Sequence, residues 1–155
     1  MAELHPALET LLLVIMANLA PWVLARLLRG RWAAPLDGGL VLADGERLLG
    51  AHKTWRGAIA GSAACAAVAA TLGYGWRLGA LFGLLALTGD ALSSCVKRRL
   101  RRRPGTEVPG LDQLPEVLLP CVVLARPLGL SLGAIAAVAA AFYVLNVAAT
   151  GIRQS

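Results

Sequence analysis

Long apolar stretches alternate with short polar ones along the whole chain. The apolar stretches cover residues 7–28, 57–73, 78–96, 114–125 and 127–152. A helix needs about 20 apolar residues to cross the hydrocarbon core of a bilayer. We therefore predict an all-α integral membrane bundle of about five transmembrane helices, formed by one domain, residues 1–155. The fourth stretch is short and contains Glu116 and Pro120, so a tilted or partly re-entrant segment is the alternative there.

Small residues repeat every four positions at the start of the second stretch. Gly57 and Gly61 form one such pair, and Ala60 and Ala64 form another. Residues four apart lie on one face of a helix, and small ones there let helix backbones approach closely in a membrane. We expect this helix to pack tightly against a neighbour. The short turn at residues 74–77 further predicts that the second and third helices are antiparallel neighbours.

The composition agrees with a membrane protein. Hydrophobic residues make up 57% of the chain and charged ones 15%, and the mean hydropathy is +0.67. The net charge of +6 raises the question of nucleic acid binding. The basic residues, however, are confined to a few loops between apolar segments, and no groove-reading motif accompanies them. This distribution favours membrane topology and contact with anionic lipid, and we expect no nucleic acid partner.

The basic residues also predict which side of the membrane each loop occupies. Residues 26–56 contain six Lys and Arg, and residues 97–113 contain six more. The opposite side has only Arg77 and Arg126. Because positive loops stay on the inside, we predict a multi-pass protein of the cell membrane with its N-terminus outside. Both polar loops and the C-terminus are then cytosolic.

Asp90 is a lone carboxylate in the uncharged stretch 78–96. A charge at such a position costs about 2.5–3.5 kcal/mol on insertion scales, so intramembrane acids usually have a function. Asp90, Ser94 and Lys97 are spaced i, i+4, i+7 and share one helix face. This polar stripe suits a metal ion and a phosphorylated substrate at the membrane surface. The alternative is a structural role for Asp90, as partner of a buried cation or of an Asn on another helix.

A basic run, residues 97–103, follows this stripe directly. One interpretation is a stop-transfer anchor on anionic lipid. The other is triphosphate binding, which needs several cations at close range. We expect Lys97 and Arg98 to contact substrate and Arg101 to Arg103 to serve mainly as anchors.

Asp112 supplies a second acid after the basic run. Alone, it could simply cap a turn after Gly110. Mg²⁺, however, prefers oxygen ligands and usually takes one or two carboxylates together with phosphate oxygens. The pair Asp90 and Asp112 therefore predicts a magnesium site at the membrane boundary, in which both residues are catalytic.

Residues 53–57 place two cations, a hydroxyl and an aromatic at the start of the second helix. An interfacial Trp55 with neighbours that snorkel to the surface is one explanation. A phosphate site that uses Lys53, Thr54, Arg56 and the helix N-terminus is the other. In the second case Lys53 and Arg56 lie opposite Lys97 and Arg98 across the mouth of the site.

The motifs follow one another in an order that resembles the CDP-archaeol synthase family, membrane cytidylyltransferases related to CDP-diacylglycerol synthases. The segments that carry the resemblance are Asn18-Leu-Ala-Pro21, Pro35-Leu-Asp37, Asp44-Gly-Glu-Arg47, Gly50-Ala-His-Lys-Thr-Trp-Arg-Gly57, Gly89-Asp90, Ser94-Cys-Val-Lys-Arg-Arg99 and Pro109-Gly-Leu-Asp-Gln-Leu114. Together they cover nearly the whole chain from Asn18 onward. The family often has Phe at Cys95 and Asp-Phe at Pro115-Glu116, and this chain departs from it there.

The resemblance implies about five transmembrane helices, a Mg²⁺ cofactor and two substrates, CTP and a lipid phosphate. CMP passes from CTP to an archaeol-type isoprenoid ether lipid phosphate, or to a phosphatidate-like one, and pyrophosphate leaves. The substrate-binding residues implied in this way are Asn18, Asp37, Thr54, Ser94, Lys97, Arg98 and Arg99.

Two other kinds of protein would share some of these sequence features. A small transporter could also contain an intramembrane Asp, but it would place polar residues deep in several helices. Another kind of lipid-phosphate enzyme, a CDP-alcohol phosphatidyltransferase, would show several aspartates on one helix, and that pattern is missing. The protein is expected to act alone or as a homodimer.

Overall fold

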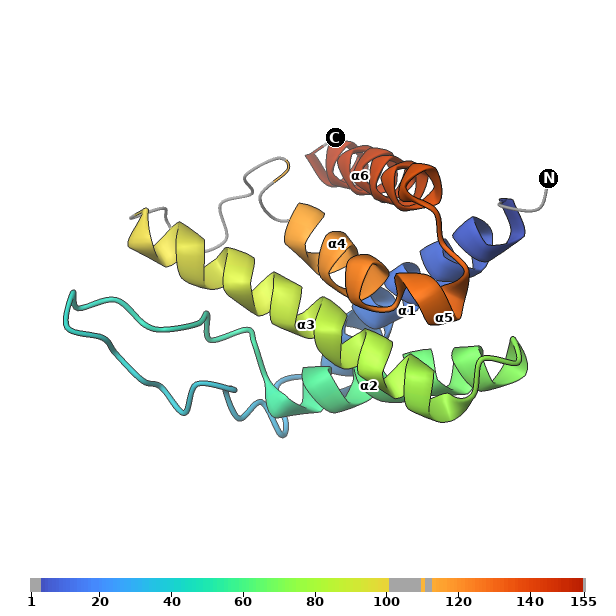
Figure 1. The fold of residues 1–155 in the computed structure, drawn as a ribbon. Helices are drawn as coiled ribbons and strands as arrows, with labels where there is room; N and C mark the ends of the chain where they lie inside the picture. Colours follow the sequence, from blue (N-terminus) through green and yellow to red (C-terminus); the bar gives the residue numbers. More distant parts are fainter. Residues whose placement is uncertain (1–3, 101–109, 111–112, 155) are drawn as a thin grey trace.

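Six helices, joined by turns and one long loop, form the part of the chain that the structure describes (Figure 1). The structure is a computed structural model and describes residues 4–100, 110 and 113–154. The helices are α1 (Leu4–Leu28), α2 (Trp55–Thr71), α3 (Trp76–Arg99), α4 (Leu114–Val123), α5 (Ala125–Leu128) and α6 (Leu132–Gln154). Within these residues, β pairing is limited to two isolated bridges in the long loop. The predicted all-α fold is confirmed.

The five predicted stretches correspond to α1, α2, α3, α4 and α6, and α5 is an additional single turn. Pro127, expected to start the last helix, lies in α5 instead. The break follows from Gly129, which has a left-handed φ of 65° and ends α5. Its N–H donates to Arg126 O, and the N–H of Leu130 donates to Ala125 O. This is the common way in which a glycine terminates a helix.

Helix length separates α4 from the clear membrane spans. Among the described residues, α1 and α3 are long and apolar enough to cross a membrane. Helix α4 has ten residues, which gives it a length of about 15 Å, half of the hydrocarbon core. A helix of this length agrees with the partly re-entrant segment that was the alternative for the fourth stretch. The sidedness of the termini stays a prediction.

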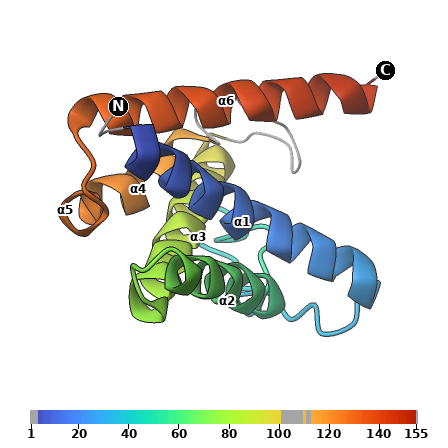
Figure 2. The same ribbon diagram turned by 90° about the vertical axis from the view of Figure 1, so that its right-hand side faces the viewer.

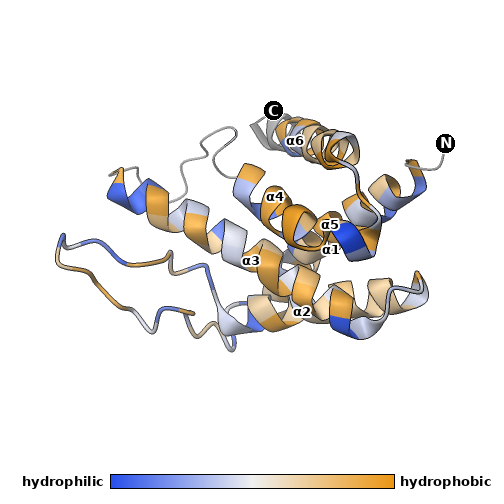
Figure 3. Ribbon diagram, in the orientation of Figure 1, coloured by the Kyte–Doolittle hydropathy of each residue, from blue (hydrophilic) through white to orange (hydrophobic). Residues whose placement is uncertain are grey.

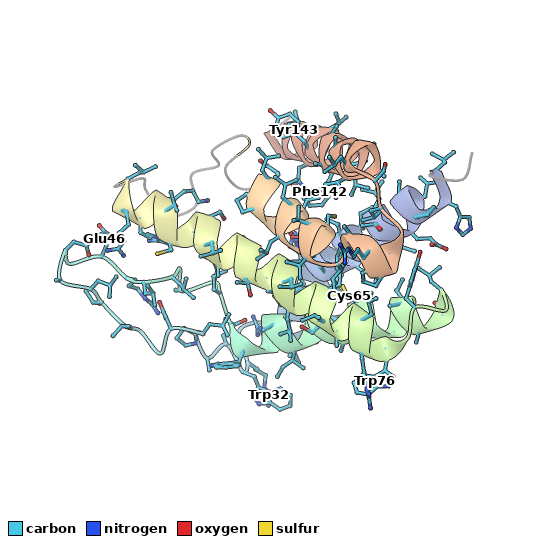
Figure 4. The ribbon with its side chains drawn as sticks, in the orientation of Figure 1. Trp32, Glu46, Cys65, Trp76, Phe142 and Tyr143 are labelled. Carbon is cyan, nitrogen blue, oxygen red and sulfur yellow. The ribbon has the colours of Figure 1, made fainter. Side chains whose placement is uncertain are left out.

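The bundle has a small apolar core and a largely apolar outer surface. The core includes Leu13 and Val14 of α1, Phe82 of α3, Val117 of α4 and Val138 of α6, all at most 2% exposed. Many other large apolar side chains of these helices are exposed, and Figure 4 shows side chains projecting from the bundle all around. Figure 3 shows that the helices are mainly hydrophobic, while the long loop and the C-terminal end of α3 carry much of the polar surface. A bilayer is the environment in which such a surface is stable.

Glycines set how closely the helices approach one another. A Cβ on Gly61 of α2 would lie 2.9 Å from the carbonyl oxygen of Ala17 in α1, and one on Gly57 would lie 3.6 Å from Pro21. The predicted close packing at this glycine pair is confirmed. On the other side of α2, a Cβ on Gly83 of α3 would lie 2.7 Å from the Cα of Ser62. Helices α2 and α3 are therefore the antiparallel neighbours that the short turn predicted.

The long loop between α1 and α2 is organised around Asp37. Its side chain has no exposed surface. It accepts hydrogen bonds from the N–H groups of Gly39 and Leu49, both at 3.0 Å, and from Arg47 Nη2 at 2.8 Å. Burial alone would raise the pKa of this carboxyl, but these three donors together lower it below its ordinary value. The carboxylate thus holds residues 37–49 in one arrangement.

This loop is attached to the C-terminal end of α3. Arg99 forms an ion pair with Asp44, and its Nη2 also donates to Arg47 O at 3.1 Å. Further along, a Cβ on Gly50 would lie 3.0 Å from Arg98 Nη2. The loop therefore runs along α3 from its basic end toward the middle of the bundle.

Candidate active site

A cavity of about 350 Å³ lies where the long loop meets the bundle. Its walls come from α1, the start of α2, the middle of α3 and α4. The polar lining residues are Asn18, His52, Lys53, Thr54, Asp90 and Glu116. The remaining walls are apolar and include Pro21, Trp22, Ala25, Leu87 and Ala91. Charged groups and an apolar wall thus share one pocket, as an amphiphilic substrate would require.

Lys53 and Asp90 form an ion pair inside this pocket. Their side chains are 14% and 28% exposed, so water screens the pair only in part. Asp90 lies seven residues before Lys97 and therefore about 10 Å further into the helix. The expected convergence of the first loop and the third helix is confirmed. Lys53, however, reaches past the level of Lys97 and Arg98, which it was expected to face, and contacts Asp90.

His52 is a residue of this pocket that the sequence analysis did not select. Burial lowers the pKa of its imidazole, and the charge of Lys53 lowers it further, with contributions from Arg98 and Lys97. The charge of Asp90 acts in the opposite direction, and the net shift is downward. His52 is therefore held in its neutral form among the cations at this end of α3.

Thr54 is the N-cap of α2, so the predicted helix start is confirmed. Its Oγ1 accepts a hydrogen bond from the N–H of Gly57 at 3.3 Å. The N–H of Trp55 donates to Ala34 O, and that of Ala58 donates to Thr54 O. Most amides of the first turn thus already have partners, and this end attracts an anion mainly through the helix dipole and Lys53.

The predicted polar stripe lies on α3, but only part of it reaches the pocket. Asp90 lines the cavity, while Ser94 is 5% exposed and is buried beyond it. Arg98 is also buried, next to Gly50, and Lys97 is half-buried. Ser93, adjacent to the stripe, donates to Asp90 O at 2.8 Å.

Three predicted site residues make contacts outside the cavity. Arg56 donates to Arg31 O, Arg99 pairs with Asp44, and Asp37 holds the loop together. Their contacts support the loop that carries Lys53, and a role at the substrate stays a prediction. Asp112 lies outside the described residues, so the predicted metal pair with Asp90 also stays a prediction. Within the described part, no three His, Cys, Asp or Glu residues gather as metal ligands.

Glu116 is the second pocket residue that the sequence analysis did not select. It is 8% exposed and lines the cavity from α4. Its position follows from Gly89, where the absence of a side chain lets α3 touch the backbone of Pro115 and Glu116. An acid in an apolar segment is itself a sign of function. In the sequence, Glu116 indicates a tilted or partly re-entrant fourth segment and a departure from the family pattern, and it is not among the predicted site residues.

Comparison with known proteins identifies the family. The family model of CarS-like CDP-archaeol synthases matches residues 4–152. A CDP-archaeol synthase of Thermofilum pendens is 42% identical over 63% of this chain and 50% of its own length. One of Pyrococcus furiosus is 32% identical over 71% of this chain and 70% of its own. This chain thus spans about half the length of the first of these relatives.

A solved structure agrees with these matches. It is described as an intramembrane enzyme for archaeal membrane lipid biosynthesis and is 35% identical in sequence. The superposition has a TM-score of 0.74 and covers 93% of this chain and 92% of the other. The resemblance noted in the sequence motifs is therefore confirmed over nearly the whole fold. This chain is a membrane protein, and it belongs to the CarS-like CDP-archaeol synthase family.

Proposed function

We propose that this protein is a membrane cytidylyltransferase that transfers CMP from CTP to a lipid phosphate, giving a CDP-lipid and pyrophosphate. The observation that carries the proposal is the pairing of Lys53 with Asp90 in a pocket that also has an apolar wall. A nucleotide phosphate and a lipid phosphate are both anions, and one of them is attached to hydrocarbon. A pocket with charge on one side and apolar surface on the other suits that combination.

The chemistry requires positioning more than proton transfer. An oxygen of the lipid phosphate attacks the α-phosphorus of CTP, and the bond from that phosphorus to the oxygen that bridges to the β-phosphorus breaks. The electron pair of that bond leaves with pyrophosphate. Because the attacking oxygen is already anionic, no strong general base is needed. The site must bring two anions together in line and stabilise the developing charge.

The residues of the pocket divide this task. Lys53 supplies a cation at the centre of the pocket, and the N-terminus of α2, capped by Thr54, points its positive dipole to the same place. Lys97 and Arg98 extend the positive field toward the end of α3. His52 stays neutral and is suited to hydrogen bonding. Trp22 and Pro21 form the apolar wall on the side of α1.

The pocket also fits a magnesium ion. Asp90 and Glu116 place two carboxylates in its wall, and the Asn18 amide lines it as well. Oxygen donors of this kind are what Mg²⁺ prefers. Asp90 would hold the ion, together with Asp112 as the sequence predicts. When bound, Mg²⁺ would neutralise phosphate charge and orient the triphosphate.

The orientation in the membrane follows from the same function. CTP is a soluble cytosolic nucleotide, so the pocket and both polar loops face the cytosol in this proposal, with the N-terminus outside. The distribution of basic residues between the loops supports this arrangement.

The proposal is tested with purified protein in lipid nanodiscs that receive CTP, Mg²⁺ and one acceptor at a time. The two acceptors are an archaeol-type isoprenoid ether lipid phosphate and phosphatidate. The lipid products are identified by mass spectrometry. We expect a CDP-lipid with at least one of them, and no product with the corresponding alcohol that lacks the phosphate. Absence of CDP-lipid with both acceptors, in protein that remains folded and binds CTP, would overturn the proposal.

A further inference from the structure

The turn that leads from α1 into the long loop carries exposed cations and an exposed indole. Figure 2 shows the chain turning here from the end of α1 toward the start of α2. Arg26, Arg29 and Arg31 are exposed, and Trp32 is 80% exposed and points away from the bundle (Figure 4). These four residues, the arginine–tryptophan elbow, do not line the cavity of the candidate active site. The elbow is therefore a separate surface.

In the part of the chain that the structure describes, no acidic side chain is paired with the cations of the elbow. The sequence has no Asp or Glu between Glu9 and Asp37. The two ion pairs of the long loop, Asp37 with Arg47 and Asp44 with Arg99, both lie outside the elbow. Three positive charges thus face outward without a counter-charge, and such a surface attracts anions.

The backbone of the elbow departs from the usual preference at such a turn. Arg29 and Trp32 have φ angles of 43° and 56°, in the left-handed region that side chains other than Gly, Asn and Asp rarely adopt. Where a helix ends in this conformation, as α1 does after Leu28, the residue is usually a glycine. Strained positions of this kind cluster at functional sites. A cation and an indole at these two positions therefore indicate that their side chains have a function.

Contacts with both neighbouring helices hold the elbow in place. The guanidinium of Arg26 lies 4.2 Å from the ring centre of Trp22, one turn earlier in α1. The N–H of Arg31 donates to Leu28 O at 2.8 Å, and its carbonyl oxygen accepts a hydrogen bond from Arg56 of α2. The cations are thus presented on an ordered piece of backbone, and this lowers the entropy that a bound anion must offset.

The chemistry of the elbow fits the head-group region of a bilayer. Guanidinium groups present planar sets of donors that suit a phosphate, and indole rings prefer the interface between hydrocarbon and water. The elbow lies at the end of α1, which is long and apolar enough to cross a membrane. A soluble anion would use the arginines alone, whereas Trp32 and Leu27, which is 73% exposed, fit the apolar part of a lipid beside its head group.

We propose that the arginine–tryptophan elbow binds the head group of an anionic phospholipid that is not a substrate of the enzyme. The phosphate lies among Arg26, Arg29 and Arg31. Trp32 and Leu27 contact the glycerol and the hydrocarbon next to it. This inference goes beyond the proposed cytidylyl transfer and does not depend on it.

Lipid titration tests the inference without CTP, so its failure is distinct from a failure of the proposed function. Purified full-length protein in a neutral detergent receives one lipid at a time, and native mass spectrometry resolves the lipids bound. The probe is phosphatidylglycerol, which is anionic and has no phosphate monoester to accept CMP, and the control is phosphatidylcholine. We expect the first phosphatidylglycerol to bind about tenfold or more tightly than phosphatidylcholine.

Two results of this titration would overturn the inference. Equal affinity for the two lipids would show that the protein does not select an anionic head group. Binding of glycerol phosphate, the soluble head group, as tightly as phosphatidylglycerol would show a site for a soluble anion instead of a lipid.

Two matched double variants locate the site. Arg29→Asn/Arg31→Gln removes two charges of the elbow, and Asn tolerates the left-handed backbone at position 29. Arg77→Gln/Arg126→Gln removes two other exposed cations, and Arg77 also lies over an indole ring, that of Trp76, at 5.4 Å. The elbow variant should raise the Kd for phosphatidylglycerol about tenfold or more, while the control variant should leave it unchanged. Equal losses in both variants, or unchanged affinity in a folded elbow variant, would overturn the inference.

Discussion

The ion pair between Lys53 and Asp90 allows a functional role for Asp90 to be separated from a purely structural one. Charges about 4 Å apart attract by about 4 kcal/mol at an effective dielectric constant of 20. Removing one member of a buried pair costs about 3–5 kcal/mol, whereas an exposed pair contributes about 0–1 kcal/mol. With side chains 14% and 28% exposed, Lys53→Met should lower the unfolding free energy by about 2 kcal/mol, between these limits.

The double variant Lys53→Met/Asp90→Asn removes both charges. It should regain most of the lost stability, because no uncompensated charge stays in the pocket. Activity should behave differently. Each single variant and the double variant should lose about 100-fold or more in kcat, as expected when a group that stabilises transition-state charge is removed.

The assay combines thermal unfolding in detergent with CDP-lipid formation in nanodiscs. Arg126→Met, which removes an exposed cation of α5, is the matched control and should change neither quantity. A double variant that recovers both stability and activity would show that the pair is only structural. Near wild-type activity of a folded Asp90→Asn variant would refute the site itself.

Three further predictions concern the surroundings of the pocket. Gly89→Ala should separate α3 from α4, because its Cβ would meet the backbone of Pro115. Circular dichroism should show that the helices are retained. Activity should fall about tenfold or more, a loss of about 1.4 kcal/mol in transition-state stabilisation. Asp37 has a lowered pKa, so its contribution to stability is present above its ordinary pKa of 3.8 and is lost as the pH falls toward the lowered value. Asp37→Asn should remove this acid-dependent part of the stability, measured by unfolding at a series of pH values. An unchanged dependence on pH would contradict the role of Asp37 in the loop. Arg56→Ala should lower activity strongly, and Arg56→Lys should restore it only partly. Arg102→Ala, in the basic run, should have little effect on turnover. Equal losses of activity in Arg56→Ala and Arg102→Ala would show that the two cations do not differ in role.

Local patterns were sufficient to predict the helices and several pocket residues. The apolar stretches predicted α1, α2, α3, α4 and α6, since each is a mainly apolar run bounded by polar or turn residues in the sequence. Asp90 stood out as an acid in an apolar helix, and the residues before Gly57 indicated a helix start that Thr54 does cap. Each of these features depends only on residues that are close together in the sequence, so it can be recognised without knowledge of the fold.

Contacts between distant segments could not be derived in the same way. Lys53 and Asp90 are 37 residues apart, and their meeting depends on how Asp37 folds the long loop. Arg56 was expected at the substrate from its place at the start of the second helix, and Arg99 from the family resemblance. The contacts of Arg56 with Arg31 O and of Arg99 with Asp44 could not be derived from the sequence, and the role of both residues at the substrate stays a prediction. Glu116 reaches the pocket only because Gly89 lets α4 approach α3.

The most direct test of the central claim follows the phosphorus atoms of CTP. Protein in nanodiscs with lipid phosphate and Mg²⁺ is given CTP labelled at either the α- or the γ-phosphate, and the lipid fraction is counted. The account predicts label in the lipid only from α-labelled CTP, release of the γ-label as pyrophosphate, and loss of both signals in Asp90→Asn. Transfer of the γ-label to lipid, or α-label transfer that is undiminished in Asp90→Asn, would contradict it.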